Sequence, residues 1–235
     1  MFGKHEIPVA LEQDDIKIEL CSSNNCTKYA RTSISDTVNK DLFIQKSDFF
    51  IEPVEPMYLP EQLTNHLLIE FENSIIIEPK SSIEIYLTFP IEIAAFTKYK
   101  KEIKRIDIFS VSKKKYTLYG DPEDGILCKY WKSPIFQNIP EVNPLKEGVL
   151  QLKIENQDAE LCEIEKAVFN AYGMKIYYDS ELVSLIAKMK IRDNFDAETT
   201  FYNKSLKPLM MKSQEMFLSA KIAVGGGKFI MEHGL

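Results

Sequence analysis

The alternation of apolar and polar residues from Ile83 to Ile93, IEIYLTFPIEI, limits the fold more than any other stretch of this 235-residue chain. Every odd-numbered position in it is apolar, whereas the even-numbered positions hold Glu84, Tyr86, Thr88, Pro90 and Glu92. A period of two residues is typical of a strand with one buried face, and a helix would scatter these apolar side chains around its surface. The stretch therefore predicts a half-buried β-strand.

The same two-residue period returns at several places along the chain. It is found at Leu67 to Phe71, Leu150 to Ile154 and Leu218 to Val224. Between these stretches lie shorter runs of residues that favour strands, IIIEP, IDIFSV, AVF and MKIYY. Proline, asparagine, glycine and serine separate the runs at the spacing expected of a sandwich. We therefore predict an all-β fold of two tandem antiparallel β-sandwich-like units of the immunoglobulin type, with at most one or two short helices.

Two segments fit either a strand or a helix. SELVSLIAKMKI, residues 180–191, has apolar residues two apart, but it also has them at helical spacing. PLMMKSQEMFLSAK, residues 208–221, begins with a proline, as many helices do. Both assignments stay open for these two segments.

The prolines predict the domain plan. Three of them lie in EPVEPMYLP, residues 52–60, and three more lie in SPIFQNIPEVNPLKEG, residues 133–148, where the alternation is interrupted. The chain is long enough for two domains of about 100 to 120 residues, each with its own core. We predict an N-terminal segment, residues 1–52, that is partly irregular and packs on the first unit. The first sandwich unit then covers residues 53–140, and the second, with a glycine-rich tail, covers residues 141–235.

Charge and cysteine content limit the classes of function. The net charge of −6 and the pI near 5.3 disfavour nucleic acid or an anionic membrane as the main partner. Acids occupy the first twenty residues where a signal peptide would be apolar, and no run reaches the roughly 18 apolar residues of a spanning helix. We expect a soluble cytoplasmic protein with no membrane span. The four cysteines, at positions 21, 26, 128 and 162, match no zinc or redox spacing, and Cys128 and Cys162 are expected in the core.

The sequence contains no catalytic signature. The only histidines are His5, His66 and His233; two lie near the chain ends, and His66, at the start of a strand, is expected at the surface or at a sheet edge. The tail AVGGGKF lacks the first glycine and the final Ser or Thr of a phosphate-binding loop, so we expect a flexible turn there or a tail that docks on a neighbour. We predict a non-enzyme with no cofactor, no metal and no catalytic residue. A carboxylate pair among the 35 acidic residues stays open.

The stretch KYTLYGDPEDGILCKYW, residues 115–131, predicts a β-hairpin with strands at 116–119 and 126–131 and a turn at Gly120–Gly125. The acids of the turn are expected first as a solvated loop tip, because their order does not match a calcium loop. The functional alternative is an aromatic platform with nearby acids that binds a small ligand. Its residues would be Tyr119, Tyr130, Trp131, Asp121 and Asp124.

Two lysine-rich segments, KYKKEIKR at 98–105 and SKKKY at 112–116, flank the predicted strand at 106–111. Lysines at strand ends are usually solvated and discourage edge-to-edge aggregation. The alternative is a surface that binds nucleic acid or an acidic partner. Its residues would be Lys100, Lys101, Lys104, Arg105, Lys113, Lys114 and Lys115.

The hairpin sequence, together with FPIEI at 89–93 and IDIFSV at 106–111, resembles an archaeal family of unknown function, domain of unknown function 432. The resemblance implies an archaeal origin and supplies no activity or functional residue. We expect a non-catalytic interaction module whose partner is another protein or a second copy bound through a sheet edge. The alternatives are a small-ligand or carbohydrate-binding sandwich and an RNA-associated protein.

Overall fold

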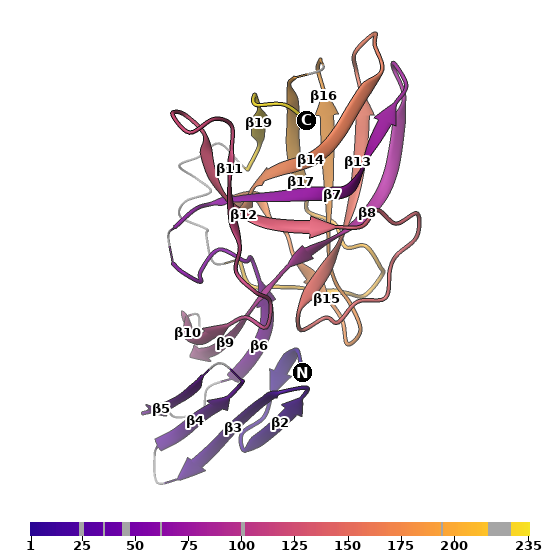
Figure 1. Cartoon of the computed structure of the whole chain (residues 1–235). Helices are drawn as coiled ribbons and strands as arrows, with labels where there is room; N and C mark the ends of the chain where they lie inside the picture. The colour runs from indigo at the N-terminus through magenta and orange to yellow at the C-terminus, as the bar shows by residue number, and fades with distance from the viewer. Residues whose placement is uncertain are drawn as a thin grey trace. The chain divides into compact units, whose positions relative to one another are not determined.

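The fold is built almost entirely of β-strands, as predicted (Figure 1). The computed structural model describes residues 1–23, 26–34, 36–43, 48–61, 63–99, 102–193, 195–215 and 227–235. Within these ranges the only helical element is one 3-10 turn, η1 (Ala171–Gly173). No helix in this part of the chain has the length and apolar character needed to cross a bilayer. All four cysteines are free, and Cys128 and Cys162 are buried, as expected.

The chain divides into two compact units that differ from the predicted plan. Unit 1 contains residues 1–52 and 93–108, and unit 2 contains residues 53–92 and 109–235. The predicted boundary after residue 140 is wrong because strands on its two sides share sheets. β8 (Ser82–Pro90) pairs along its whole length with β13 (Glu147–Asn156), and β7 (His66–Ile77) pairs with β14 (Cys162–Asn170). The N-terminal segment is also mostly strand, and it shares its unit with residues 93–108.

Unit 1 consists of two four-stranded sheets. The first has the order β1-β6-β9-β10, with β1 (Gly3–His5), β6 (Asp48–Val54), β9 (Glu92–Tyr99) and β10 (Glu102–Phe109). The second has the order β2-β3-β4-β5, with β2 (Val9–Gln13), β3 (Ile16–Ser23), β4 (Cys26–Thr32) and β5 (Thr37–Leu42). The sheets meet at side chains such as Tyr29 and Phe49, whose ring centroids lie 6.2 Å apart. Unit 1 therefore has its own apolar core.

A buried polar network also joins the two sheets of unit 1. Asp107 on β10 accepts hydrogen bonds through Oδ2 from Arg31 Nε at 2.6 Å and from the Tyr29 hydroxyl at 2.8 Å. Arg31, which is only 1% exposed, also contacts Asp36 through Nη1 at 2.6 Å. Burial, and then the neighbouring Asp107 charge, raises the pKa of Tyr29, so its hydroxyl stays protonated and donates. These charges are buried because each one has a partner.

Unit 2 contains one sheet of four strands and one of seven. The first has the order β11-β12-β7-β14, where β11 is Tyr116–Tyr119 and β12 is Ile126–Ser133. The second has the order β18-β15-β16-β13-β8, with β17 paired to β16 and β19 paired to β17. Its other strands are β15 (Tyr177–Tyr178), β16 (Val183–Ile191), β17 (Ala197–Tyr202), β18 (Met211–Lys212) and β19 (Phe229–Met231).

The sheets of unit 2 are mixed rather than purely antiparallel. β12 runs parallel to β7, and β13 runs parallel to β16. In both pairs the strands are not consecutive in the sequence, so the chain crosses over between them, as parallel pairing requires. The two sheets are joined inside the unit, where the Trp131 indole donates to Thr88 Oγ1 at 2.8 Å and the Thr199 hydroxyl donates to the Val168 carbonyl.

The structure shows which secondary structure one of the two ambiguous segments adopts, and it describes part of the glycine-rich tail. Residues 183–191 form the strand β16, because its alternate side chains fill the core of unit 2. Of the second segment, residues 211–212 are strand, and 216–226, with the predicted strand at 218–224, lie outside the described residues. Gly227, with φ of +80°, lies against the backbone of Gly173, and a Cβ added at Gly227 would come within 2.3 Å of the Gly173 Cα. This close approach requires glycine.

A buried ion pair fixes the proline-rich segment at the start of unit 2. Glu92 is fully buried, and its Oε1 lies 2.7 Å from Lys129 Nζ, which is itself 4% exposed. The same carboxylate accepts backbone N–H groups from Tyr58 at 2.9 Å and Leu59 at 3.2 Å. Burial lowers the pKa of Lys129, whereas the Glu92 charge opposes that shift. The pair therefore holds residues 58–59 against β12.

Candidate binding groove

The predicted hairpin is present. β11 and β12 pair antiparallel with Tyr116 opposite Lys129 and Tyr119 opposite Ile126. The turn between them is closed by the Gly125 N–H, which donates to the Asp121 carbonyl at 2.8 Å. Glycine favours turns because it has no Cβ to restrict the backbone, and aspartate because its carboxylate accepts backbone N–H groups two or three residues on.

The predicted platform of three aromatic rings does not form. Side chains alternate along β12, so Tyr130 and Trp131 point to opposite faces of the sheet. Trp131 turns inward, where its indole donates to Thr88. Tyr119 and Tyr130 lie on the other face. The strand period therefore separates the tryptophan from the two tyrosines, and it leaves those two as the aromatic part of the site.

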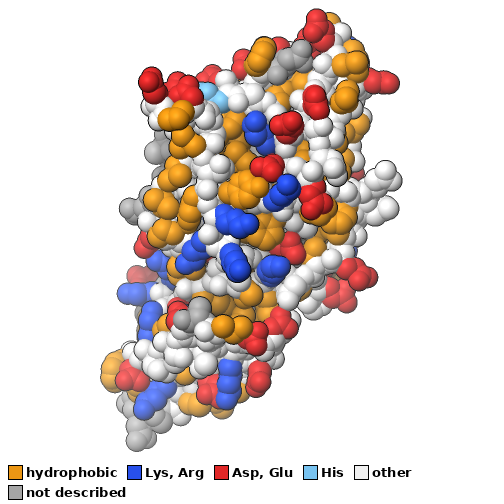
Figure 2. Space-filling model, in the orientation of Figure 1, with side chains coloured by type: hydrophobic (Ala, Val, Ile, Leu, Met, Phe, Trp, Pro, Cys, Tyr) orange, Lys and Arg blue, Asp and Glu red, His pale blue; other side chains and the backbone are white. Residues whose placement is uncertain are grey.

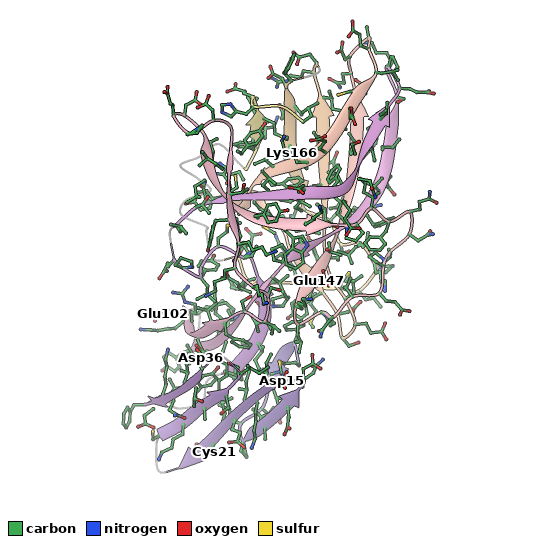
Figure 3. All side chains as sticks on the ribbon, in the orientation of Figure 1. Asp15, Cys21, Asp36, Glu102, Glu147 and Lys166 are labelled. Atoms are coloured by element: carbon green, nitrogen blue, oxygen red, sulfur yellow. The ribbon has the colours of Figure 1, made fainter. Side chains whose placement is uncertain are left out.

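An open groove of about 520 Å³ lies on the tyrosine face of this sheet. We call it the Tyr130 groove; Figures 2 and 3 view unit 2 from this side. Side chains from all four strands, the hairpin turn and the C-terminal segment contribute to it. Its lining residues are Leu68, Glu70, Thr117, Leu118, Tyr119, Gly120, Asp121, Tyr130, Lys166 and His233.

The hairpin end of the groove is fastened to the C-terminal residues. The buried Tyr119 hydroxyl donates to the Gly234 carbonyl at 2.9 Å and accepts the His233 N–H at 3.1 Å. The His233 ring stands edge-on to the Tyr119 ring, with centroids 5.3 Å apart. At Gly120, which has φ of +103°, an added Cβ would come within 2.9 Å of that imidazole. The turn and the C-terminal residues therefore form one wall.

The acids of the turn have different roles. Asp121 Oδ1 accepts the backbone N–H groups of Glu123 at 2.9 Å and Asp124 at 3.3 Å, and these bonds hold its pKa below the usual value. The Asp121 carboxylate is therefore ionised at neutral pH, and it lines the groove. The Asp124 side chain does not line the groove, so of the two predicted acids only Asp121 belongs to the site.

The opposite end of the groove carries lysines around one carboxylate. Lys132 on β12, Glu70 on β7 and Lys166 on β14 are direct neighbours across three strands. Lys132 Nζ lies 3.4 Å from Glu70 Oε1. Partial burial raises the pKa of Tyr130, and the Glu70 charge raises it further. Lys166 on β14 (Figure 3) has no ion-pair or hydrogen-bond partner within the residues that the structure describes.

The lysine segments belong to different units. Lys104 and Arg105 lie in unit 1, whereas Lys113, Lys114 and Lys115 are exposed in unit 2; Lys100 and Lys101 lie outside the described residues. The Lys115 carbonyl accepts the Tyr130 N–H at 2.9 Å, which places Lys115 opposite Tyr130 in the sheet. Part of the predicted cationic surface therefore adjoins the Tyr130 groove.

Sequence reasoning missed Glu70, Lys166 and His233 as groove residues. Glu70 follows the apolar run at 67–69, and Lys166 precedes AVF, so both looked like ordinary polar positions of half-buried strands. Only the pairing of β7 with both β12 and β14 brings them together. His66, expected at the surface or an edge, is half-buried at the start of the inner strand β7 beside Phe229, and burial lowers its pKa. No three metal-ligating side chains gather among the described residues.

In a comparison with family models, residues 1–232 match a family described as a protein of unknown function, DUF432. The chain belongs to the DUF432 family. No curated protein and no solved structure matches this DUF432 chain. The family assignment agrees with the resemblance seen in the sequence, and it covers both units.

The thiol of Cys128 makes the stability of this DUF432 protein pH-dependent. Burial raises its pKa to about 12, whereas an unfolded thiol titrates near 8.5. The unfolded chain loses this proton first, so the free energy of unfolding falls as pH rises from about 8.5 toward 12, by up to about 1.4 kcal/mol per pH unit. We expect urea denaturation at stepped pH to show a shallower slope for Cys128→Ala. The exposed Cys21→Ala is the control; an equal slope change there would contradict the assignment.

Proposed function

We propose that this protein is a non-catalytic binding module and that the Tyr130 groove is its site for a small polar ligand. The observation that carries this proposal is the convergence of Tyr130, Asp121, Glu70 and Lys166 on one open groove from three strands and a turn. Its volume of about 520 Å³ lies in the range of small-molecule sites. Two carboxylates, an ammonium and a phenol can bond a ligand that carries both donors and acceptors.

The described lining residues are suited to holding a polar ligand. Among them are one imidazole, His233, and one aliphatic hydroxyl, Thr117. Glu70 and Asp121 lie at different ends of the groove, on β7 and in the hairpin turn. The residues present can orient and hold a ligand, and this is what the proposal assigns to them.

A thermal-shift screen tests the proposal. Amino acids, sugars and organic phosphates are added singly to the full chain, and we expect at least one to raise the melting temperature. A ligand at about 100 times its Kd adds roughly 2.7 kcal/mol, which corresponds to about 5–10 °C for a domain of this size. Tyr130→Ala and Lys166→Ala should remove the shift, and Lys204→Ala, which changes an exposed lysine outside the groove, should retain it. A shift that survives both groove substitutions would place the ligand elsewhere.

A protein partner is the second candidate, supported by the edge of the same sheet. β11 is the outermost strand of its sheet, and its Leu118 faces Leu127 of β12 with 43% and 36% of the two side chains exposed. An exposed edge with an apolar pair is a template for another strand, here a second copy of this chain. We expect a dimer in sedimentation that Leu127→Lys converts to a monomer; a wild-type monomer at high concentration argues against it.

We also propose an archaeal origin and a cytoplasmic location. The first rests on the likeness of the hairpin sequence to an archaeal family. Four free cysteines support the second, because thiols persist in reducing compartments.

A further inference from the structure

Charge is unevenly distributed along the Tyr130 groove. One end carries Lys166, with Lys132 and Glu70 as neighbours on the adjoining strands, and Lys115 stands across the sheet from Tyr130. Figure 2 shows blue side chains gathered over β12 and β7 on this face. The other end carries the acids of the hairpin turn, including the ionised Asp121. This protein has a net charge of −6, so the lysine end is a local positive region on an acidic molecule.

The ring of Tyr130 stands within this positive region. Lys115, the residue before β11, is its neighbour across the sheet, and Lys132 follows Tyr130 by two residues on the same strand and the same face. Two residues of strand span about 7 Å, and neighbouring strands lie about 4.8 Å apart. Tyr130 therefore has a lysine as neighbour in two directions in the sheet, and Lys166 stands two strands farther across.

We propose that the groove binds a nucleotide, with its base against Tyr130 and its phosphate at Lys166, which lines the groove. This inference rests on the proposed function of the groove and names its ligand class. Every base has a π-face that stacks on an aromatic ring, and lysines bind phosphates as point charges. A free mononucleotide and one unit of a single-stranded nucleic acid share this chemistry.

The acidic end of the groove fixes the orientation of the ligand. The Asp121 carboxylate repels a phosphate, which directs it toward the lysines. The same carboxylate accepts hydrogen bonds, so it suits the hydroxyl or amino groups at the opposite end of a nucleotide. Glu70 already has Lys132 at 3.4 Å, and Lys166 remains for the ligand. Each end of the site therefore prefers a different end of the same molecule.

Binding measurements with defined probes test this inference. The full chain is titrated at about 50 mM salt, where phosphate contacts are strong, with AMP, ATP, a labelled twelve-nucleotide single-stranded RNA and inorganic pyrophosphate. We expect Lys166→Glu to weaken nucleotide binding at least tenfold and the matched Lys204→Glu to change it less than twofold. Tyr130→Ala should weaken nucleotide binding roughly tenfold because base stacking is lost, and it should change the affinity for pyrophosphate less than twofold. Urea midpoints confirm that each variant is folded.

The probes separate the two sources of the ligand. Saturable binding of AMP or ATP identifies a free nucleotide, whereas binding of the RNA alone, with a steep loss as salt rises, identifies a single strand. If none of the nucleotides and not the RNA binds at low salt, the inference is overturned. It is also overturned if Lys166→Glu and Lys204→Glu weaken nucleotide binding equally. If a sugar or amino acid instead raises the melting temperature and Tyr130→Ala removes that rise, the groove is a binding site and only the assignment of a nucleotide as its ligand is wrong.

Discussion

Glu92→Leu should lower the free energy of unfolding of unit 2 by about 3–5 kcal/mol, because it leaves a buried ammonium without a partner. The substitution removes the carboxylate that lies 2.7 Å from Lys129 Nζ and that also accepts the N–H groups of Tyr58 and Leu59. Urea denaturation followed by fluorescence measures the effect, since the only tryptophan, Trp131, lies on the same strand as Lys129.

A second substitution and an exposed pair serve as controls. Lys129→Met added to Glu92→Leu should recover part of the loss, because the unpaired ammonium is then gone and only two backbone N–H groups lack an acceptor. Lys132→Met breaks the exposed pair with Glu70, whose side chains are 50% and 40% exposed, and should cost less than about 1 kcal/mol. A loss for Glu92→Leu no larger than that for Lys132→Met would show that the buried pair contributes little.

Arg31→Leu should have an effect of similar size in unit 1. Among the described residues it leaves buried Asp107 with the Tyr29 hydroxyl and the Ile108 N–H as donors, and breaking such a buried pair costs about 3–5 kcal/mol. Hydrogen exchange of the amides of β4 and β10 reports this unit separately from the tryptophan. We expect their protection to fall by a factor of about 100 or more, since each 1.4 kcal/mol changes an equilibrium tenfold.

The control for Arg31 lies on the neighbouring strand. Lys17 on β3 contacts Glu19 at 2.8 Å, but the two side chains are 51% and 44% exposed. Lys17→Met should therefore leave the protection of β4 and β10 nearly unchanged. If Lys17→Met and Arg31→Leu reduce protection equally, the network around Asp107 is not what joins the two sheets.

Local sequence signals predicted the strands and the hairpin well, because these depend on short-range patterns. The turn of the hairpin, Gly120–Gly125, consists of residues that favour turns, and the strands on either side follow the period of two. The same period predicted the wrong environment for Glu92, which occupies a polar position of the run Ile83–Ile93 and yet is fully buried. A buried charge has the same sequence signature as an exposed one, and only its partner, 37 residues away, distinguishes the two.

The domain plan failed for a related reason. The alternation continues without a break from β8 into β9, although β8 ends at Pro90 in unit 2 and the residues after Glu92 belong to unit 1. A period of two reports which face of a strand is buried, and it does not report which core buries it. The parallel pairing of β12 with β7, which brings Tyr130 near Glu70, and the pairing of β14 with β7, which adds Lys166, are equally absent from any local pattern.

The interleaving of the two units has a consequence for synthesis on the ribosome. Unit 1 is complete once residue 108 has emerged, so it can close while unit 2 still consists of β7 and β8 alone. Those two strands must then wait for β12, β13 and β14, which are their sheet partners. During that interval the apolar side chains between Leu67 and Phe89, which are buried in the finished fold, lack those partner strands and are open to aggregation.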